Sequence, residues 1–286
     1  MKRALAPEQF VRSTYESQRT EKCSIEDVAV VVSSCDKYRD LWTPFFTLFF
    51  RYWPDCPYPV SLITNFETYS DTRVRTIRMG RDRNWSSILA GSLRRIREPL
   101  VLIMMEDYLL DRPVDTERIR RLVDYMKRKG AAYLRLFPVP GPDVLCADNP
   151  QLGEIHKGAE YRLSLQAAIW DRRTLLKLLR WGESPWELER LGSKRTDALE
   201  APFFSVRGDL PEGPPLHYFC TAVTRGLWLP EAVKLCENER IHVDLSVRPL
   251  FGESVARGGL REKVLTRMAR RARLIWHRAI ASFLGA

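Results

Sequence analysis

Two adjacent carboxylates, Glu106 and Asp107, directly follow the apolar run Leu100–Met105. An uninterrupted apolar run of this length is typical of a strand that is buried on both faces of a parallel sheet. Ligands of open α/β sheets bind beyond the carboxyl ends of such strands, and divalent cations prefer hard oxygen ligands. The pair therefore predicts a ligand or metal site. Solvation of both acids at the strand end, or pairing with neighbouring arginines, is the alternative interpretation.

A second group of aromatic and acidic residues lies between Trp181 and Glu189, in the sequence Trp-Gly-Glu-Ser-Pro-Trp-Glu-Leu-Glu. Pro185 is typical of a first helical turn, which places the following acids near the positive end of a helix. These acids either complement the helix dipole or are available for proton transfer. The residues by themselves leave both interpretations open.

Alternating strands and helices are predicted to position these residues. The first half of the chain predicts strands at 28–33, 59–65, 73–77, 100–105 and 132–137, with helices that end near 53, span 85–97 and end near 129. Such alternation favours an α/β fold with a mostly parallel sheet and helices on both faces. Pro44 suits the first turn of the first helix. The second half is less regular, and helices are predicted around Ser164–Trp181 and from about Pro185.

The order of these features resembles the GT-A glycosyltransferases, in particular bacterial enzymes of capsule, lipopolysaccharide or exopolysaccharide synthesis. The shared features are a polar Ser-Ser-Cys-Asp loop at 33–36, a second strand that ends in Thr-Asn at 64–65, a helix that begins at Trp85, and an apolar strand that ends in acids. The resemblance covers roughly residues 27–250. The chain departs from the family's Asp-x-Asp motif, because Glu106 and Asp107 are adjacent, and this departure leaves metal dependence open.

The resemblance implies a site for a nucleotide-sugar donor. The residues that would hold its nucleoside, ribose or phosphates are Ser33, Ser34, Asp36, Asn65, Asp82, Asn84 and Ser87. Glu106 and Asp107 would hold the donor as well, through Mn²⁺ or Mg²⁺ if the enzyme uses a metal, and His217 would be a further metal ligand. Helix capping and ordinary loop polarity are the alternative interpretations of the single polar residues.

The same resemblance implies an acceptor site at 181–189. Trp186 would stack on a sugar ring, and Glu187, with Glu189 as the second choice, would accept the proton of the attacking hydroxyl group. The implied activity is transfer of a hexosyl or related glycosyl group, with inversion favoured. The donor is a nucleotide sugar, and the acceptor is a hydroxyl group of a glycan or of a lipid-linked molecule.

Basic residues concentrate at the end of the chain. The formal net charge is +10, and seven Lys or Arg stand against one acid from residue 259 onward. Within 251–286 the apolar and basic residues fall on opposite faces at helical spacing, which predicts a basic amphipathic helix on an anionic membrane. Packing of this helix on the body is the alternative. Residues 1–26 are expected to be a polar leader without the apolar core of a signal peptide, so the expected location is cytoplasmic and peripheral at the inner face of the cytoplasmic membrane.

Two other classes of function compete with this interpretation. A nucleic-acid-binding protein without catalysis would explain the charge but not the acids at the strand end, so no nucleic acid is expected as a partner. A nucleotidyltransferase would share the α/β layout, but its usual glycine-rich basic loop after the first strand is absent. The motifs of P-loop NTPases, dinucleotide dehydrogenases and α/β-hydrolases are absent as well. The six cysteines show no Cys-x-x-Cys spacing and are expected to be reduced thiols.

Overall fold

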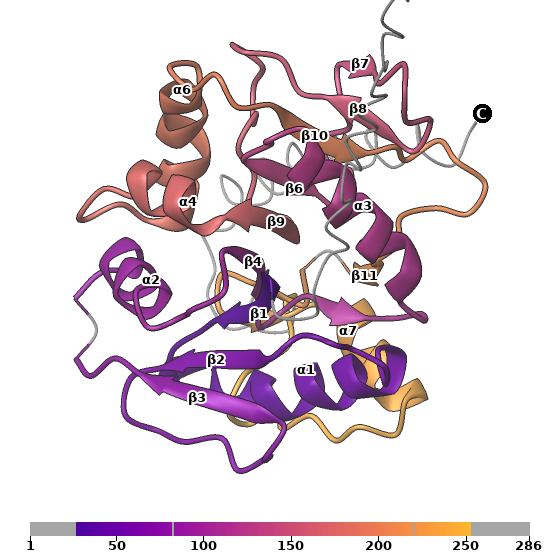
Figure 1. Ribbon diagram of the computed structural model, residues 1–286. Coiled ribbons are helices and arrows are strands. Elements are labelled where there is room, and N and C mark those ends of the chain that lie inside the picture. The colour runs from indigo at the N-terminus through magenta and orange to yellow at the C-terminus, as the bar shows by residue number, and fades with distance from the viewer. Residues whose placement is uncertain (1–26, 82, 220, 253–286) are drawn as a thin grey trace, which may run out of the picture.

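A nine-stranded mixed β-sheet forms the centre of the molecule, and helices cover both of its faces (Figure 1). The computed structural model describes residues 27–81, 83–219 and 221–252. The expected leader, Asp82 and all but the first two residues of the expected C-terminal helix lie outside the described residues. The strand order is β3-β2-β1-β4-β9-β6-β10-β8-β7. The predicted α/β class, with a sheet flanked by helices, is confirmed.

Four neighbouring strands of the sheet run parallel. They are β1 (Val28–Ser33), β2 (Val60–Thr64), β3 (Val74–Arg78) and β4 (Leu100–Met105), close to their predicted bounds. β1 pairs with β2 on one side and with β4 on the other. Ser33 lies opposite Met105 in this register, so the loops after β1 and β4 leave the sheet side by side. This is the switch point at which open α/β sheets form a binding crevice.

Alternate side chains of β1 and β4 belong to two apolar cores, one on each face of the sheet. The first core is covered by α1 (Arg39–Tyr52), α3 (Thr116–Arg128) and α7 (Pro230–Asn238). The second core is covered by α2 (Trp85–Leu93) and α4 (Arg172–Leu178). Burying one valine side chain contributes roughly 1.5–3 kcal/mol. The valines of β1 therefore fix this strand between the layers, together with the polar loop at its end.

The helix predicted around Ser164–Trp181 is wrong in its first half. That part of the chain is β9 (Ala168–Asp171), which lies antiparallel between β4 and β6 (Tyr133–Arg135), and the helix begins only at Arg172. Ala168, Ile169 and Trp170 are all fully buried. A short run that is apolar on both faces shows neither a helical nor a strand period, so periodicity does not separate the two structures.

The first helix begins earlier than predicted. A 3₁₀ turn at Asp36–Tyr38 leads into α1, so Pro44 lies inside the helix and not in its first turn. A proline inside a helix removes one backbone hydrogen bond and costs about 3 kcal/mol. The apolar side of α1, which includes Trp42, Phe45 and Phe49, is buried, and this burial offsets the cost.

The second half of the described chain extends the sheet and covers its carboxyl edge. β10 (Phe203–Val206) is parallel to β6, and β8 (Leu152–Glu154) and β7 (Val144–Leu145) add antiparallel strands. The predicted helix from Pro185 is confirmed as α5 (Pro185–Glu187), a π-helical turn (Leu188–Gly192) and α6 (Ser193–Thr196). Two small ribbons pair β5 (Leu109–Leu110) with β11 (Tyr218–Phe219), and β12 (Val223–Thr224) with β13 (Leu227–Trp228).

Two further findings concern the cysteines and the helices of the described residues. The four cysteines among the described residues form no disulfide bond with one another. In the part of the chain that the structure describes, no helix combines the length and the apolar character needed to cross a membrane.

Candidate functional site

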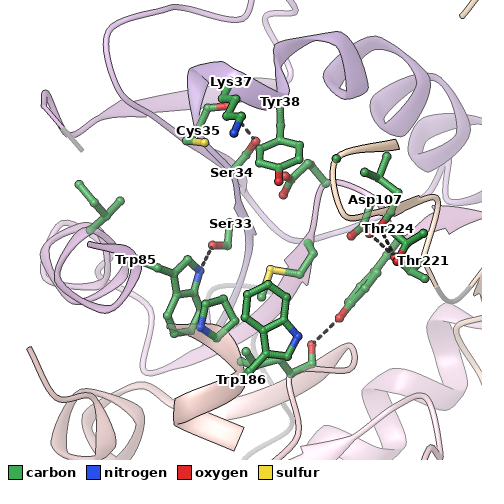
Figure 2. Close-up of a pocket in the computed structure, with 18 of the residues that line it drawn as sticks. Ser33, Ser34, Cys35, Lys37, Tyr38, Trp85, Asp107, Trp186, Thr221 and Thr224 are labelled. Atoms are coloured by element: carbon green, nitrogen blue, oxygen red, sulfur yellow. Dashed lines mark hydrogen bonds between the residues drawn. The ribbon is translucent and has the colours of Figure 1, made fainter. Parts of the chain in front are cut away.

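A cleft of about 820 Å³ opens at the carboxyl ends of β1 and β4. Its walls come from segments that are far apart in the sequence: the loops after β1 and β4, the start of the helix at 185–196, and residues 221–226 (Figure 2). The predicted site residues that line the cleft are Ser33, Ser34, Asn65, Glu106, Asp107, Trp186 and Glu189. The fold thus brings candidates from the donor side and the acceptor side into one cavity.

Two indole groups hold the serines at the end of β1, Ser33 and Ser34. Trp85 donates its Nε1–H to the Ser33 hydroxyl at 3.0 Å, and Trp42 donates to the Ser34 hydroxyl at 2.8 Å. Trp85 is the first residue of α2 and itself lines the cleft (Figure 2). These bonds join strand, loop and helix at the cleft wall and give the two hydroxyl groups fixed positions, as a binding site requires.

Asp36 and Asn65 hold each other's loops together. The Asp36 carboxylate accepts hydrogen bonds from the backbone amides of Asn65, Phe66 and Glu67, and the Asn65 side-chain oxygen accepts one from the Asp36 amide. Asn65 lines the cleft, whereas Asp36 does not. The direct donor contact predicted for Asp36 has no support in its position, because its carboxylate oxygens already organise the loop after β2.

The acid pair at the end of β4 lies deep in the cleft. Glu106 is 9% exposed, and Asp107 accepts a hydrogen bond from the Thr221 hydroxyl at 2.5 Å (Figure 2). Burial raises the pKa of both carboxyls, that of Asp107 to about 6, and the charge of Asp107 raises the pKa of Glu106 further. Two carboxyls buried side by side are costly when both are ionised, so they favour a bound cation or another positive group.

The raised pKa of Asp107 predicts a pH-dependent stability. Folding moves this pKa from 3.8 to about 6, so the folded state binds the proton more tightly than the unfolded state. The resulting stabilisation is fully present below the unfolded value and is lost as the pH rises through about 6. We therefore expect the melting temperature of Asp107→Asn to rise relative to that of the wild type between about pH 4 and pH 7. Thermal unfolding across that range measures the difference, and a difference that stays constant would contradict the assignment.

Two cationic side chains, Lys37 and Arg225, line the same cleft. Arg225 occupies the two-residue turn between β12 and β13 with a φ of 53°, and Gly226 follows with a φ of 78°. A non-glycine residue in this left-handed region persists only where its surroundings hold it. Thr221 provides part of that support, since its hydroxyl contacts both Asp107 and the Val223 carbonyl. The turn therefore fixes the backbone of Arg225 beside the cleft.

A buried arginine, Arg248, links two walls of the cleft, the loop after β1 and the β12–β13 turn. Its guanidinium bonds both carboxylate oxygens of Asp40, at 2.8 and 2.9 Å, and donates to the carbonyls of Lys37 and Gly226. Its positive charge also lowers the pKa values of the acid pair, against the larger effect of burial. Arg248 thus fixes the loop after β1 relative to the β12–β13 turn.

The opposite wall of the cleft carries Trp186 and Glu189. Trp186 is 76% exposed, and Figure 2 shows it across the cleft from Lys37 and Tyr38. Glu189 lies in the π-helical turn and accepts hydrogen bonds from the Leu165 amide at 2.8 Å and the Ser164 hydroxyl at 3.2 Å. Burial raises the pKa of Glu189, although these hydrogen bonds oppose the effect. A carboxylate with a fixed position and a raised pKa is suited to accept a proton.

A chain of hydrogen bonds supports Glu189 from the interior. Arg135 is fully buried and donates to the Tyr133 hydroxyl at 3.0 Å, and Tyr133 donates to the Ser164 carbonyl at 2.9 Å. Arg135 also donates to the Tyr161 carbonyl at 2.6 Å. These bonds fix the loop that ends at Leu165, and the loop in turn orients the carboxylate of Glu189.

Glu187, the first choice for the base in the sequence prediction, is engaged in helix capping. It accepts hydrogen bonds from the amide and the hydroxyl of Ser184 and forms a capping box with that residue. These bonds lower its pKa, its side chain is exposed, and it does not line the cleft. The positions of the two side chains therefore favour Glu189 over Glu187 as the candidate base, because a general base must reach the proton that it removes.

Asn84, Ser87 and His217 also lie outside the lining of the cleft. Asn84 caps α2 by accepting a hydrogen bond from the Ser87 amide at 2.9 Å, which matches the capping interpretation of both residues. His217 lies with its Nδ1 2.6 Å from Oδ1 of Asp111 and is engaged there, so it is not placed to complete a metal site with the acid pair. Asp82 lies outside the described residues.

Whether the cleft could hold a divalent metal ion depends on Glu106 and Asp107. Among the described residues, no cluster of three His, Cys, Asp or Glu side chains could hold a metal ion. Glu106 and Asp107 nevertheless fit Mg²⁺ or Mn²⁺, since Mg²⁺ is often held by one or two carboxylates and takes its other ligands from phosphates and water. Their burial with raised pKa values supports this fit. A metal bound here would need the phosphates of the ligand to complete its coordination.

The sequence prediction missed several residues that shape the cleft, among them Lys37, Tyr38, Gln166 and Thr221. Thr221 acquires its position through Asp107, which is 114 residues away in the sequence, and no local pattern reports such a contact. The β12–β13 turn could have been predicted from the sequence. Arg225-Gly226 stands between two short strand-like segments, and a residue pair that ends in Gly at such a place is typical of a two-residue hairpin.

The fold is an α/β fold with a cleft at the switch point of its sheet. A scan of protein-family models and a search of curated proteins give no match. Among solved structures, TarS 1–349 from S. aureus is similar at 10% identity and a TM-score of 0.42, over 64% of this chain and 60% of that one. TarS 1–349 has also been solved in complex with UDP-GlcNAc and with UDP.

Two cytidylyltransferases are similar to the chain as well. The 2-C-methyl-D-erythritol 4-phosphate cytidylyltransferase from Thermus thermophilus is 14% identical with a TM-score of 0.43, over 74% of this chain and 98% of that one. A cytidylyltransferase from Leptospira borgpetersenii is 12% identical with a TM-score of 0.41, over 75% and 95%. The match spans less than two thirds of TarS 1–349. Likenesses at these identities and TM-scores assign no function to the chain.

Proposed function

We propose that the chain is a glycosyltransferase that moves a sugar from a nucleotide-sugar donor to an acceptor hydroxyl group. The observation that carries the proposal is the presence of the Glu106–Asp107 pair and Glu189 in one cleft, at the switch point of the sheet. The acid pair suits the phosphate-bearing part of a donor if a cation is bound, and Glu189 suits removal of a proton from an acceptor. In this proposal the donor and the acceptor approach along opposite walls of the one cleft.

The donor would lie along the loop after β1. Ser33, Ser34 and Asn65 offer polar groups at the strand ends, beside the apolar surface of α2. When bound, a divalent cation would be held by Glu106 and Asp107 and would supply neutralisation of the donor's diphosphate. Arg225 would hold the leaving diphosphate, because a guanidinium group binds phosphate oxygens in a bidentate manner.

The acceptor would enter along the opposite wall. The exposed ring of Trp186 would stack on a sugar ring and bring the acceptor hydroxyl to the carboxylate of Glu189. Glu189 accepts the hydroxyl proton while the oxygen bonds to the anomeric carbon and the bond from that carbon to the diphosphate breaks. A single displacement of this kind inverts the configuration at the anomeric carbon.

The expected biological setting follows from the sequence features. The proposed acceptor is a glycan or a lipid-linked molecule of bacterial surface polysaccharide synthesis, in agreement with the family resemblance. The proposed location is the inner face of the cytoplasmic membrane, where the basic segment 251–286 would bind anionic lipids.

A nucleotide sugar is expected to stabilise the folded chain. A ligand at about 100 times its Kd adds roughly 2.7 kcal/mol to the free energy of unfolding, which raises the melting temperature by about 5–10 °C for a chain of this size. Thermal unfolding with UDP-, GDP-, dTDP- and CMP-sugars, each with and without Mn²⁺ or Mg²⁺, measures the effect. The absence of a shift with every donor would contradict the proposal.

A further inference from the structure

The outer edge of the cleft carries exposed arginines that the proposed reaction does not use. Arg78 ends β3, Arg81 and Arg83 lie in the loop between β3 and α2, and Arg95 follows α2. None of the four forms an ion pair with a carboxylate in the described ranges. Residues 66–98 contain eight arginines and no lysine. This choice of residue favours phosphate groups, which a guanidinium binds in a bidentate manner.

Hydrogen bonds between neighbouring residues bring together the segments that carry these arginines and two exposed aromatic residues. Arg95 donates to the Arg78 carbonyl at 2.8 Å, which links the end of α2 to β3. We call the loop between β3 and α2, which carries Arg81 and Arg83, the arginine loop. At one end of this loop the Gly80 amide donates to the carbonyl of Asn65, next to Phe66. At the other end Asn84 accepts a hydrogen bond from the Gly182 amide, next to Trp181. We call this surface the arginine rim, and its residues are Phe66, Arg78, Arg81, Arg83, Arg95 and Trp181.

Carboxylates beside the arginine rim are already engaged. Glu67 and Glu183 form ion pairs with arginines outside the rim, at 3.6 and 2.7 Å. The oxygens of Asp36 accept backbone amides. Asp82 stands within the arginine loop in the sequence and lies outside the described residues. Four arginines against this single acid give the rim a positive charge.

The arginine rim also exposes two large aromatic side chains. Trp181 is 83% exposed and Phe66 is 66% exposed, and neither lines the cleft. Tryptophan is enriched where a membrane meets water, and arginine is attracted to the phosphates of anionic lipids.

We propose that the arginine rim docks the folded body on an anionic phospholipid surface, with Trp181 and Phe66 at the headgroup boundary and the arginines on the lipid phosphates. This surface is separate from the basic segment 251–286. It also orients the cleft, because Asn65 and Trp85 line the cleft and flank the arginine loop. A cleft held in this way meets an acceptor that is carried on a lipid, although the docking itself does not require the transfer reaction.

A bilayer fits the arginine rim better than a nucleic acid does. Proteins that bind single strands stack the bases on aromatic side chains within a positively charged groove. Here Trp181 and Phe66 stand outside the cleft, and the cleft beside them holds the acids Glu106 and Asp107. Those acids repel a polyanion, whereas a flat anionic surface contacts only the rim.

Vesicle co-sedimentation of the full chain tests the docking, with vesicles of phosphatidylcholine alone and of phosphatidylcholine with phosphatidylglycerol. Each arginine near an anionic surface contributes about fivefold to partitioning, which corresponds to about 1 kcal/mol. Arg81→Gln/Arg83→Gln should therefore bind the anionic vesicles roughly 25-fold more weakly than the wild type. The matched control, Arg121→Gln/Arg128→Gln, removes the same charge from exposed positions of α3 and should bind like the wild type. Both variants keep residues 251–286, so the contribution of that segment cancels.

Fluorescence quenching by brominated lipids reports whether a tryptophan side chain contacts the lipid, which electrostatic attraction alone does not produce. The wild type should lose more tryptophan fluorescence on brominated anionic vesicles than Trp181→Phe does.

Equal binding by the rim and control variants would overturn the proposal, as would equal quenching with and without Trp181. Binding to DNA that depends on Arg81 and Arg83, without binding to anionic vesicles, would overturn it in favour of a nucleic-acid surface. Donor-induced thermal stabilisation is measured without vesicles, so failure of the docking and failure of the proposed reaction are distinguishable.

Discussion

Asp107→Asn is expected to reduce the rate of sugar transfer by about 10²–10³-fold while the chain stays folded. The replacement keeps the size of the side chain and a group that can bond Thr221, but it removes the negative charge at the end of β4. That charge is what a cation on the donor's diphosphate would bind. Initial rates at saturating donor measure the effect, and thermal unfolding checks the fold. Glu106→Gln is expected to show a comparable loss.

Asp111→Asn is the matched control for this prediction. Asp111 lies four residues further along the chain and pairs with His217 outside the lining of the cleft, so its replacement should leave the transfer rate close to that of the wild type. Near-normal rates in both acid-pair variants would show that the pair is structural. Loss of activity in EDTA, with recovery on adding Mn²⁺ or Mg²⁺, is expected if the pair acts through a metal.

Glu189→Gln is expected to lower kcat by about 10²–10⁴-fold, as the loss of a general base does. Donor binding should change little, because Glu189 lies on the wall opposite the loop after β1. The wild-type rate should also fall as the pH drops below the raised pKa of Glu189, since the base must be ionised to accept a proton. The Gln variant should lack that part of the pH profile.

Glu187→Gln provides a control two residues away on the same helix. Its carboxylate caps the helix through Ser184 and does not line the cleft, so the variant should lose some stability and keep a kcat near that of the wild type. The opposite pattern, with a large rate loss in Glu187→Gln and a normal rate in Glu189→Gln, would return the role of base to Glu187.

The sequence predicted the parts of the fold that depend on local pattern. The strand Leu100–Met105 and the acids that follow it could be located because an apolar run and a sudden change to charge are both local features. The same holds for β1 and for the helix start at Pro185. The meeting of the loops after β1 and β4 at one edge also follows from the predicted pattern, since parallel strands end at the same edge of a sheet.

Other parts of the site depend on tertiary contacts that no local pattern reports. Glu187 and Glu189 have nearly the same sequence context, and only the contact of Glu189 with the loop at 164–165 separates them. The resemblance to GT-A glycosyltransferases implied a donor contact for Asp36, but its carboxylate accepts hydrogen bonds from the loop after β2. The strand β9 was hidden because its residues are buried on both faces.

The most direct test of the proposed reaction is the identity of the product that the full chain releases. The chain is incubated with nucleotide sugars, a divalent cation and simple glycoside or lipid-extract acceptors. A parallel reaction contains nucleoside triphosphates and sugar 1-phosphates, and chromatography separates the products. Glycosyl transfer predicts release of a nucleoside diphosphate (or of CMP from a CMP-sugar) in the first reaction, abolished by Asp107→Asn, and no pyrophosphate in the second. Release of pyrophosphate in the second reaction, without turnover of any nucleotide sugar in the first, would show nucleotidyl transfer and contradict the proposed function.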